Sequence, residues 1–134
     1  MNSWVLDSSA VLALLQAEPG ADKVRPVLPE ACICAVNAAE VISKLCEPRK
    51  DRAGISPAEA TATFKTLESF GLEVIAFDLD QACLAGELRP ATQPFGLSLG
   101  DRACLGLARQ MGLGVMTTDA VWRNLPDFQV TVIR

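Results

Sequence analysis

The chain has 134 residues, of which 50% are apolar, and a formal net charge of −4. This composition fits one globular domain over residues 1–134, and the acidic balance argues against a protein that coats nucleic acid through a broad basic surface. The apolar runs are shorter than the roughly 18 residues that a membrane span needs. The first residues lack the basic region and long apolar core of a signal peptide, so we expect a cytoplasmic protein without a membrane segment.

Cysteine and histidine content narrows the chemistry further. The five cysteines are an odd number and form no C-x-x-C pair, so neither a disulfide framework nor a zinc site is expected. Apolar neighbours predict that all five are small core residues in a reducing compartment: Cys32, Cys34, Cys46, Cys83 and Cys104. The chain has no histidine, which excludes Ser–His, Cys–His and His–metal chemistry.

Predicted strands and helices alternate along the chain. In order, we expect a strand at 4–6, a helix at 8–17, a weaker helix at 21–28, a strand at 30–34, a helix at 35–46, a charged loop at 47–54, a helix at 57–70, a strand at 72–77, a helix at 78–88, a loop at 89–96, a helix at 98–111, a strand at 115–118, a short helix at 120–124 and a strand at 129–133. Capping-box patterns begin the helices after Ser56 and at Ser98. This alternation predicts an α/β fold, a three-layer α/β/α sandwich with a mainly parallel central sheet.

Four acidic residues occupy positions where a buried site would need them. Asp7 and Asp119 each follow an apolar strand, and the carboxyl ends of parallel strands meet at one edge of the sheet. Glu40 lies beside the apolar stripe of its helix, and Asp101 lies in the first turn of its helix. Four carboxylates in one pocket would repel one another unless a hard divalent cation, Mg²⁺ or Mn²⁺, neutralised them. Without histidine, a metal-activated water is the reasonable nucleophile, which suits phosphodiester hydrolysis.

Each acid also has a purely structural interpretation. Asp7 and Asp119 could be helix N-caps, and Asp101 could complete a capping box. Glu40 could pair with Lys44, four residues further along the same helix. Polar neighbours could orient ligands or water, or could serve only in caps and turns: Ser8, Ser9, Asn37, Thr117 and Thr118. One basic cluster could grip a nucleic acid locally or could be a solvated helix end and loop: Lys44, Arg49, Lys50 and Arg52.

Four short motifs follow one another along the chain in an order and at a spacing that resemble those of a known family. They are Leu6-Asp7-Ser8-Ser9, Asn37-Ala38-Ala39-Glu40, Leu97-Ser98-Leu99-Gly100-Asp101-Arg102 and Thr117-Thr118-Asp119-Ala120-Val121-Trp122. Together they resemble the PIN-domain ribonucleases and, within them, the VapC toxins of bacterial type II toxin–antitoxin systems. The resemblance covers nearly the whole chain.

This resemblance implies a Mg²⁺- or Mn²⁺-dependent endoribonuclease toxin that cuts structured RNA such as tRNA or rRNA. The catalytic and metal-binding acids of the family match Asp7, Glu40, Asp101 and Asp119, with Asp7 and Asp101 as the usual direct metal ligands. The family usually forms homodimers and is held inactive by a VapB antitoxin, whose tail covers the acidic pocket. Arg102, Lys44 and Arg49 are then possible contacts to RNA or to the antitoxin, and a surface or core ion pair is the alternative for Arg102.

Two other functions are compatible with parts of the sequence. Val74–Asp80 resembles the strand and D-x-D motif of haloacid dehalogenase phosphatases, with Asp78 as the nucleophile. That mechanism needs a lysine downstream, and none follows Lys65, so we interpret Asp78 as a helix cap. The second alternative is a non-catalytic PIN-like module that docks a protein or RNA partner; the presence of all four acids argues against it.

Overall fold

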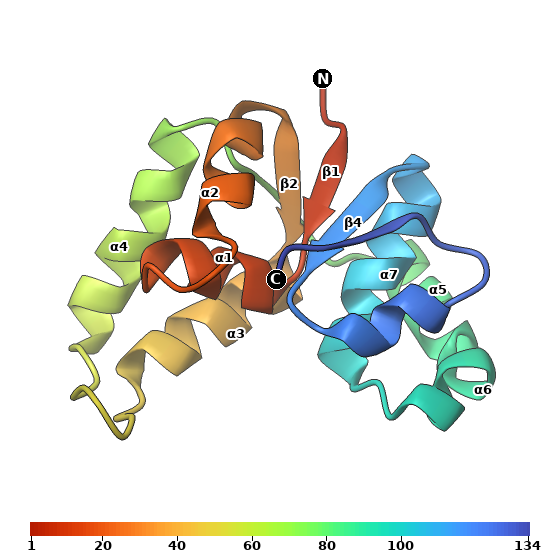
Figure 1. The fold of residues 1–134 in the computed structure, drawn as a ribbon. Coiled ribbons are helices and arrows are strands. Elements are labelled where there is room, and N and C mark those ends of the chain that lie inside the picture. The colour runs from red at the N-terminus through yellow and green to blue at the C-terminus, as the bar shows by residue number, and fades with distance from the viewer.

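Five parallel strands form one sheet in the computed structural model, which describes all 134 residues (Figure 1). The strand order is β3-β2-β1-β4-β5, so the first strand of the chain lies in the centre. The strands are β1 (Trp4–Leu6), β2 (Ala31–Cys34), β3 (Glu73–Ile75), β4 (Gly114–Thr117) and β5 (Val130–Val132). Every neighbouring pair is parallel, as the alternating pattern predicts.

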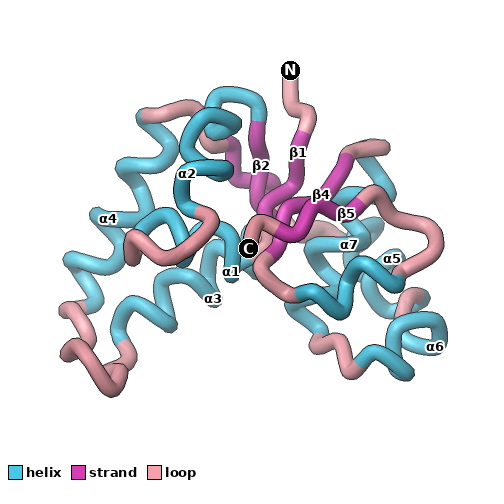
Figure 2. The backbone as a smooth tube through the Cα atoms, viewed as in Figure 1, coloured by secondary structure: helices cyan, strands magenta, loops and turns pink.

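Helices cover both faces of this sheet, which confirms the predicted α/β/α sandwich. They are α1 (Ser8–Leu15), α2 (Ala21–Val24), α3 (Ala35–Cys46), α4 (Pro57–Ser69), α5 (Leu79–Glu87), α6 (Arg89–Thr92) and α7 (Leu99–Met111), with 3₁₀ turns η1 (Arg25–Glu30), η2 (Gln93–Phe95) and η3 (Ala120–Asn124). Figure 2 shows the strands between two groups of helices, with α1, α2 and α4 on one side and α5, α6 and α7 on the other. Helix α3 contacts α1 and α4 but also α7, so it links the two layers.

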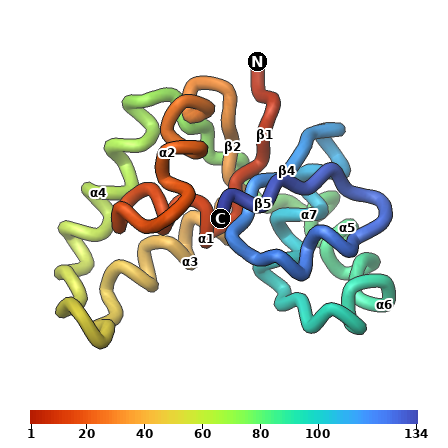
Figure 3. The backbone as a smooth tube through the Cα atoms, viewed as in Figure 1, coloured from red at the N-terminus to blue at the C-terminus, as the bar shows by residue number.

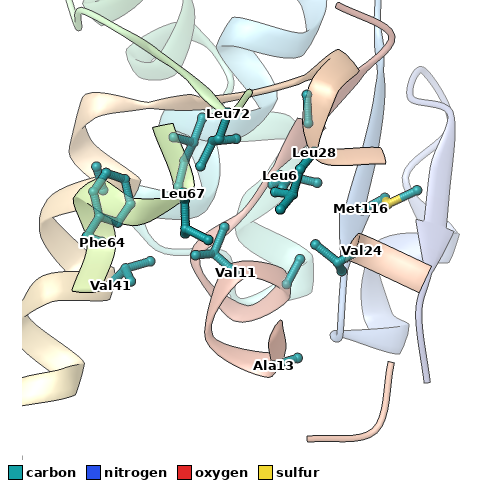
Figure 4. Packing of buried hydrophobic residues seen from close by; sticks show 14 of the residues in the cluster. Leu6, Val11, Ala13, Val24, Leu28, Val41, Phe64, Leu67, Leu72 and Met116 are labelled. Carbon is teal, nitrogen blue, oxygen red and sulfur yellow. The ribbon is translucent and has the colours of Figure 1, made fainter. Parts of the chain in front are cut away.

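Two apolar cores hold the layers against the sheet. One packs α1, α3 and α4 onto the strands through side chains such as Leu6, Val11 and Phe64 (Figure 4). The other packs α7 onto the opposite face around Val5, Cys104 and other buried residues. Successive residues of β1 therefore face different cores, which explains why the central strand is apolar throughout.

The C-terminal segment returns to the N-terminal half of the molecule. Strand β5 is at the sheet edge, and the blue C-terminal end in Figure 3 reaches the red segment between α1 and α2. There Ile133 packs against Gly20, whose backbone has a φ of 100°. Arg134 forms an ion pair with Glu18 at 3.7 Å. These contacts fix the end of α1 relative to the sheet.

Four details differ from the predictions. The helix predicted at 21–28 is a short α2 followed by η1, because Pro26 and Pro29 interrupt α-helical hydrogen bonding. The loop predicted at 89–96 contains α6 and η2, each with a proline at its start. Helix α1 ends at Leu15, because Ala17 adopts a φ of 52°.

The fourth difference concerns the thiols. All five cysteines are free, but Cys83 is exposed and Cys46 only half-buried, so the prediction of five core cysteines is wrong for those two.

None of the helices has the length and apolar character that crossing a bilayer requires.

Direct strand-to-helix turns shape the carboxyl edge of the sheet. Strand β1 turns into α1 across Asp7 alone, and β2 turns into α3 without an intervening residue. Strand β4 reaches η3 across Thr118 and Asp119. These tight turns bring the starts of three helical elements to one edge, and α7 packs against α3 there.

Candidate active site

Asp7 is the buried centre of this edge. Its side chain caps α1 and accepts a hydrogen bond from the backbone N–H of Ala10 at 2.8 Å. The hydroxyl of Ser9 donates to the same Oδ1 at 2.7 Å, and the hydroxyl of Thr117 donates to Oδ2 at 2.6 Å. Only 4% of the residue is exposed. The carboxylate is therefore held in one orientation by donors from two chain segments.

Burial makes the charge of this carboxylate costly. Desolvation raises the pKa of Asp7 to about 6, although the hydrogen bonds from Thr117, Ser9 and Ala10 lower it. The charge of Asp101 contributes a further, smaller increase. The charges of Asp7 and Asp101 therefore disfavour each other.

Glu40 is placed beside the N-terminus of α7 by Asn37. The Nδ2 group of Asn37 donates to Glu40 Oε1 at 2.8 Å and to the carbonyl oxygen of Gly100 at 2.9 Å. The carboxylate of Glu40 packs so closely on Gly100 that a Cβ there would lie 2.7 Å from Glu40 Cδ. Asp101 follows directly and accepts a 2.9 Å hydrogen bond from the backbone of Ser98. Helices α3 and α7 thus place Glu40 against Gly100, the residue before Asp101.

Asp119 is connected to Asp7 through Thr117. The hydroxyl of Thr117, which donates to Asp7, accepts a hydrogen bond from the backbone N–H of Asp119 at 3.1 Å. The side chain of Asp119 is exposed and accepts from the N–H of Val121 at 3.0 Å, which caps η3. Asp119 therefore lies at the solvent side of the same edge.

None of the four acids has a basic partner. Every ion pair in the structure involves other carboxylates, namely those of Glu18, Glu47 and Asp127. No group of three or more Asp, Glu or Cys side chains is arranged so that it could hold a metal ion by itself. The expectation that all four acids meet around one ion is therefore not what this conformation shows. The edge instead combines unneutralised carboxylates with hydroxyl groups, a set of hard oxygen donors that suits Mg²⁺ or Mn²⁺.

The structural interpretations of three acids are correct as well. Asp7 and Asp119 are N-caps, and Asp101 completes a capping box with Ser98. The interpretation of Glu40 as a partner of Lys44 is wrong, because Glu40 pairs with Asn37.

The predicted supporting residues lie around these acids. Asn37 is 1% exposed, and its Oδ1 has no hydrogen-bond partner. The backbone N–H of Thr118 donates to Ser9 Oγ at 3.0 Å, so Thr118 supports the site through its backbone. Ser8 lines a cavity that also contains Glu40.

Of the three basic residues predicted to contact RNA or an antitoxin, only Lys44 has a side chain that is exposed and weakly paired. Arg102 is only 7% exposed and donates to the carbonyl oxygen of Ala85 at 2.9 Å, so its guanidinium is held inside the chain and forms no ion pair. Arg49 donates to Gln16 and pairs with Glu18 at 3.0 Å, which commits its guanidinium within the chain. Lys44 is exposed.

Asp78 is a helix cap, as interpreted from the sequence. Its carboxylate accepts from the N–H of Gln81 at 2.9 Å and begins α5 after the edge strand β3. The structure gives this residue the cap role, so the D-x-D resemblance has a local explanation.

Sequence reasoning missed Gly100 and Ser43. Gly100 lies in the first turn of α7, although glycine is a poor helix former. A glycine in this position could have indicated that another part of the chain packs closely against the helix. Ser43 lies three residues after Glu40, on the same helix face, and lines the same cavity.

Comparison with known proteins identifies a family match. The model of the PIN domain matches residues 4–127. The chain is 30% identical over 116 residues to ribonuclease VapC42 of Mycobacterium tuberculosis, covering 81% of this chain and 84% of the relative. Among solved structures, it is similar to a chain of the DNA-bound VapBC of Salmonella typhimurium (TM-score 0.74, 19% identity, 98% of each chain). It is also similar to VapC20 of M. tuberculosis, described as a sarcin–ricin loop cleaving toxin (TM-score 0.70, 18% identity, 95% and 99% of the chains).

Replacing Gly100 with Ala should displace Glu40. Gly86 in α5 is the matched control, because a Cβ there meets nothing within 4 Å. Gly86→Ala should raise the free energy of unfolding by about 0.5–1 kcal/mol through helix propensity. Gly100→Ala should lack this gain, because the new methyl group forces Glu40 away from Asn37. Urea denaturation measures both, and an equal gain in the two variants would contradict the packing of Glu40 on Gly100.

Replacing Asp7 with Asn should change how stability depends on pH in metal-free buffer with EDTA. Because the pKa of Asp7 is raised in the folded protein, the wild-type chain loses stability relative to Asp7→Asn as the pH rises from about 4 to about 6, by about 2–3 kcal/mol. Urea denaturation across this range measures the difference. Asp78→Asn, at an exposed N-cap, controls for the loss of a carboxylate. Parallel pH curves for wild type and Asp7→Asn would show that burial does not perturb Asp7.

Proposed function

The chain belongs to the PIN-domain family, and we propose that it is a divalent-metal-dependent endoribonuclease, the toxin of a VapBC-type toxin–antitoxin system. The observation that carries this proposal is the edge of the sheet where Asp7, Glu40, Asp101 and Asp119 lie without any basic partner. No histidine is available to act as a base. An acidic edge of this kind suits cation binding and phosphodiester hydrolysis.

We assign direct metal binding to Asp7 and Asp101, with Glu40 and Asp119 completing the acidic surroundings. Mg²⁺ is usually held by one or two carboxylates together with water and substrate phosphate, so it does not need a cluster of three acids. A bound Mg²⁺ or Mn²⁺ would supply Lewis-acid activation of water and of the phosphodiester. It would also offset the cost of the buried charge on Asp7.

The surrounding residues act by fixing the orientation of these carboxylates. Thr117 and Ser9 each donate a hydroxyl hydrogen bond to the carboxylate of Asp7. These bonds fix the direction in which the remaining lone pairs of the carboxylate oxygens point. Asn37 fixes Glu40 against α7. Such supporting hydrogen bonds keep ligands in position and limit the reorganisation needed when charge develops during the reaction.

The names of the similar proteins support the substrate and partner that we propose. The matched relatives are called ribonucleases, and VapC20 is described as cleaving the sarcin–ricin loop, so a structured RNA such as tRNA or rRNA is the proposed substrate. The VapBC complexes support a VapB-type antitoxin as inhibitor. We further propose a homodimer that acts in the cytoplasm, where free thiols like the five in this chain persist.

An apolar groove offers such an antitoxin a docking surface. It lies between α1, η1 and α4, has a volume of about 550 Å³, and includes Leu14, Leu28 and Phe70. Phe70 is 65% exposed. Grooves of this character accept the apolar face of an amphipathic segment. This groove is separate from the acidic edge, so one partner chain could engage both only through an extended tail.

A non-catalytic module that binds RNA or protein is the second candidate. The observation that favours it is that Asp7, Asp101 and Asp119 all have capping roles at the starts of helical elements. The two candidates differ in whether the purified protein cuts RNA.

Purified protein with Mn²⁺ should cut a labelled tRNA pool, and EDTA should stop the cutting. Asp119→Asn should lower the rate by about 10–100-fold, because a residue of the metal surroundings is lost. Asp78→Asn is the matched control: both residues are aspartate N-caps, and asparagine caps equally well. Gel electrophoresis of the RNA measures the rates. Activity that survives EDTA, or that is lost in Asp78→Asn but kept in Asp119→Asn, would contradict the proposed nuclease.

Mn²⁺ should also stabilise the folded protein. At about 100 times its Kd, an ion that binds only the folded state adds about 2.7 kcal/mol and raises the Tm by roughly 5–10 °C. Asp101→Asn should remove most of this shift. Glu59→Gln is the control, because Glu59 holds the equivalent first-turn position in α4, with its N–H donating to the N-cap Ser56, and does not lie at the site. Differential scanning calorimetry with and without Mn²⁺ measures the rise in Tm of each variant and separates the loss of a cap from the loss of a ligand. An undiminished rise in Tm for Asp101→Asn would contradict the assignment of Asp101 as a metal ligand.

A further inference from the structure

A groove runs from the acidic edge between α1 and α3, which lie side by side in Figures 1 and 3. Its volume is about 510 Å³, within the range of ligand-binding clefts. Its lining comprises Ser8, Ser9 and Leu12 from α1 and Val36, Ala39, Glu40, Ser43 and Lys44 from α3. Because Glu40 belongs to this lining, the groove opens directly onto the candidate active site.

Helix α3 presents two different faces. One buries Ala38, Val41 and Leu45 in the core. The other runs along the groove at helical spacing, from Val36 through Glu40 to Lys44. Ser43 and Lys44 lie about 4.5–6 Å further along the helix axis than Glu40. This separation is comparable to one nucleotide step of an extended strand.

Polar groups along the groove lack strong partners within the protein. The hydroxyls of Ser8 and Ser43 make no hydrogen bond within the chain, whereas that of Ser9 is bonded to Asp7. The ammonium group of Lys44 has one partner, Glu47, at 3.5 Å, and both side chains are about 60% exposed. An exposed pair of this kind is weak, so a phosphate could displace Glu47.

A smaller cavity of about 220 Å³ adjoins the groove and shares Leu12 and Lys44 with it. Arg49 bounds this cavity and is tied to Gln16 and Glu18. Lys44 is therefore the cation in the groove that remains available to a ligand.

We propose that the α1–α3 groove is a subsite for the RNA backbone, in which Lys44 binds the phosphate one nucleotide away from the phosphate that is cut. Ser8 and Ser43 donate hydrogen bonds to the backbone, and the aliphatic floor of Leu12, Val36 and Ala39 takes the nucleoside. This inference rests on the proposed function. A phosphodiester fits better than an apolar peptide, because the rim offers one ammonium group and two unpartnered hydroxyls.

The binding of fluorescein-labelled octauridylate in EDTA tests the subsite without cleavage. Fluorescence anisotropy is measured between about 50 and 200 mM NaCl, where phosphate contacts weaken with salt. Lys44→Ala should weaken binding about threefold to tenfold and reduce the salt slope by about 0.7, equally for octaadenylate, because it removes one phosphate contact. Lys65→Ala, which removes an exposed lysine from α4, should leave both quantities unchanged.

Filling the groove provides a second test. Ala39→Leu should reduce affinity at all salt concentrations, whereas Ala62→Leu, at an exposed position of α4 outside every cavity, should not. Equal binding by Lys44→Ala, Ala39→Leu and wild type, together with Mn²⁺-dependent cleavage by wild type, would overturn the subsite and leave the nuclease proposal intact. A wild-type protein that neither binds the oligonucleotide nor cuts RNA would overturn both. If Ala39→Leu lost only antitoxin binding, the groove would belong to the protein partner instead.

Discussion

The burial of Asp7 without a cationic partner is the constraint on which the rest of the structure depends. Asp7 directly follows the central strand, is 4% exposed and has a pKa raised to about 6, so its charge is costly in the absence of a cation. Hydroxyl and backbone donors hold the carboxylate in place but do not neutralise it. A buried carboxylate is usually neutralised by an ion pair with lysine or arginine, and Asp7 forms no such pair. The proposed site for a divalent cation is consistent with this arrangement.

The same residues serve both local structure and the proposed chemistry. Asp7, Asp101 and Asp119 cap helical elements, so their backbone positions are fixed by the helix starts that gather at the carboxyl edge. Glu40 is not a cap, and it is positioned instead by Asn37 and by the missing side chain of Gly100. Capping and metal binding are compatible, because a carboxylate oxygen that accepts one N–H keeps further lone pairs.

Much of the fold and part of the candidate site could be predicted from the sequence. Apolar runs alternating with helical patterns predict the parallel sandwich, and strand ends predict the edge at which Asp7 and Asp119 lie. Local patterns could not predict the burial of Arg102 or the exposure of Cys83, because both depend on how α5 packs on α7 and on what faces solvent. They also missed the contact between Glu40 and Gly100, which joins residues 60 positions apart through the tertiary fold. Prolines also misled the prediction in two segments: 21–28 was predicted as one helix but becomes 3₁₀ from Arg25, and 89–96 was predicted as a loop but contains α6.

We propose that a divalent cation binds between Asp7 and Asp101. Anomalous diffraction from crystals grown with Mn²⁺ tests it most directly, because the signal locates the metal without assumptions about density. If the cation binds there, a strong peak lies about 2.0–2.3 Å from carboxylate oxygens of both residues, with water completing the shell. Crystals that bind Mn²⁺ only elsewhere, or that leave this edge free of anomalous signal at saturating metal, would contradict it.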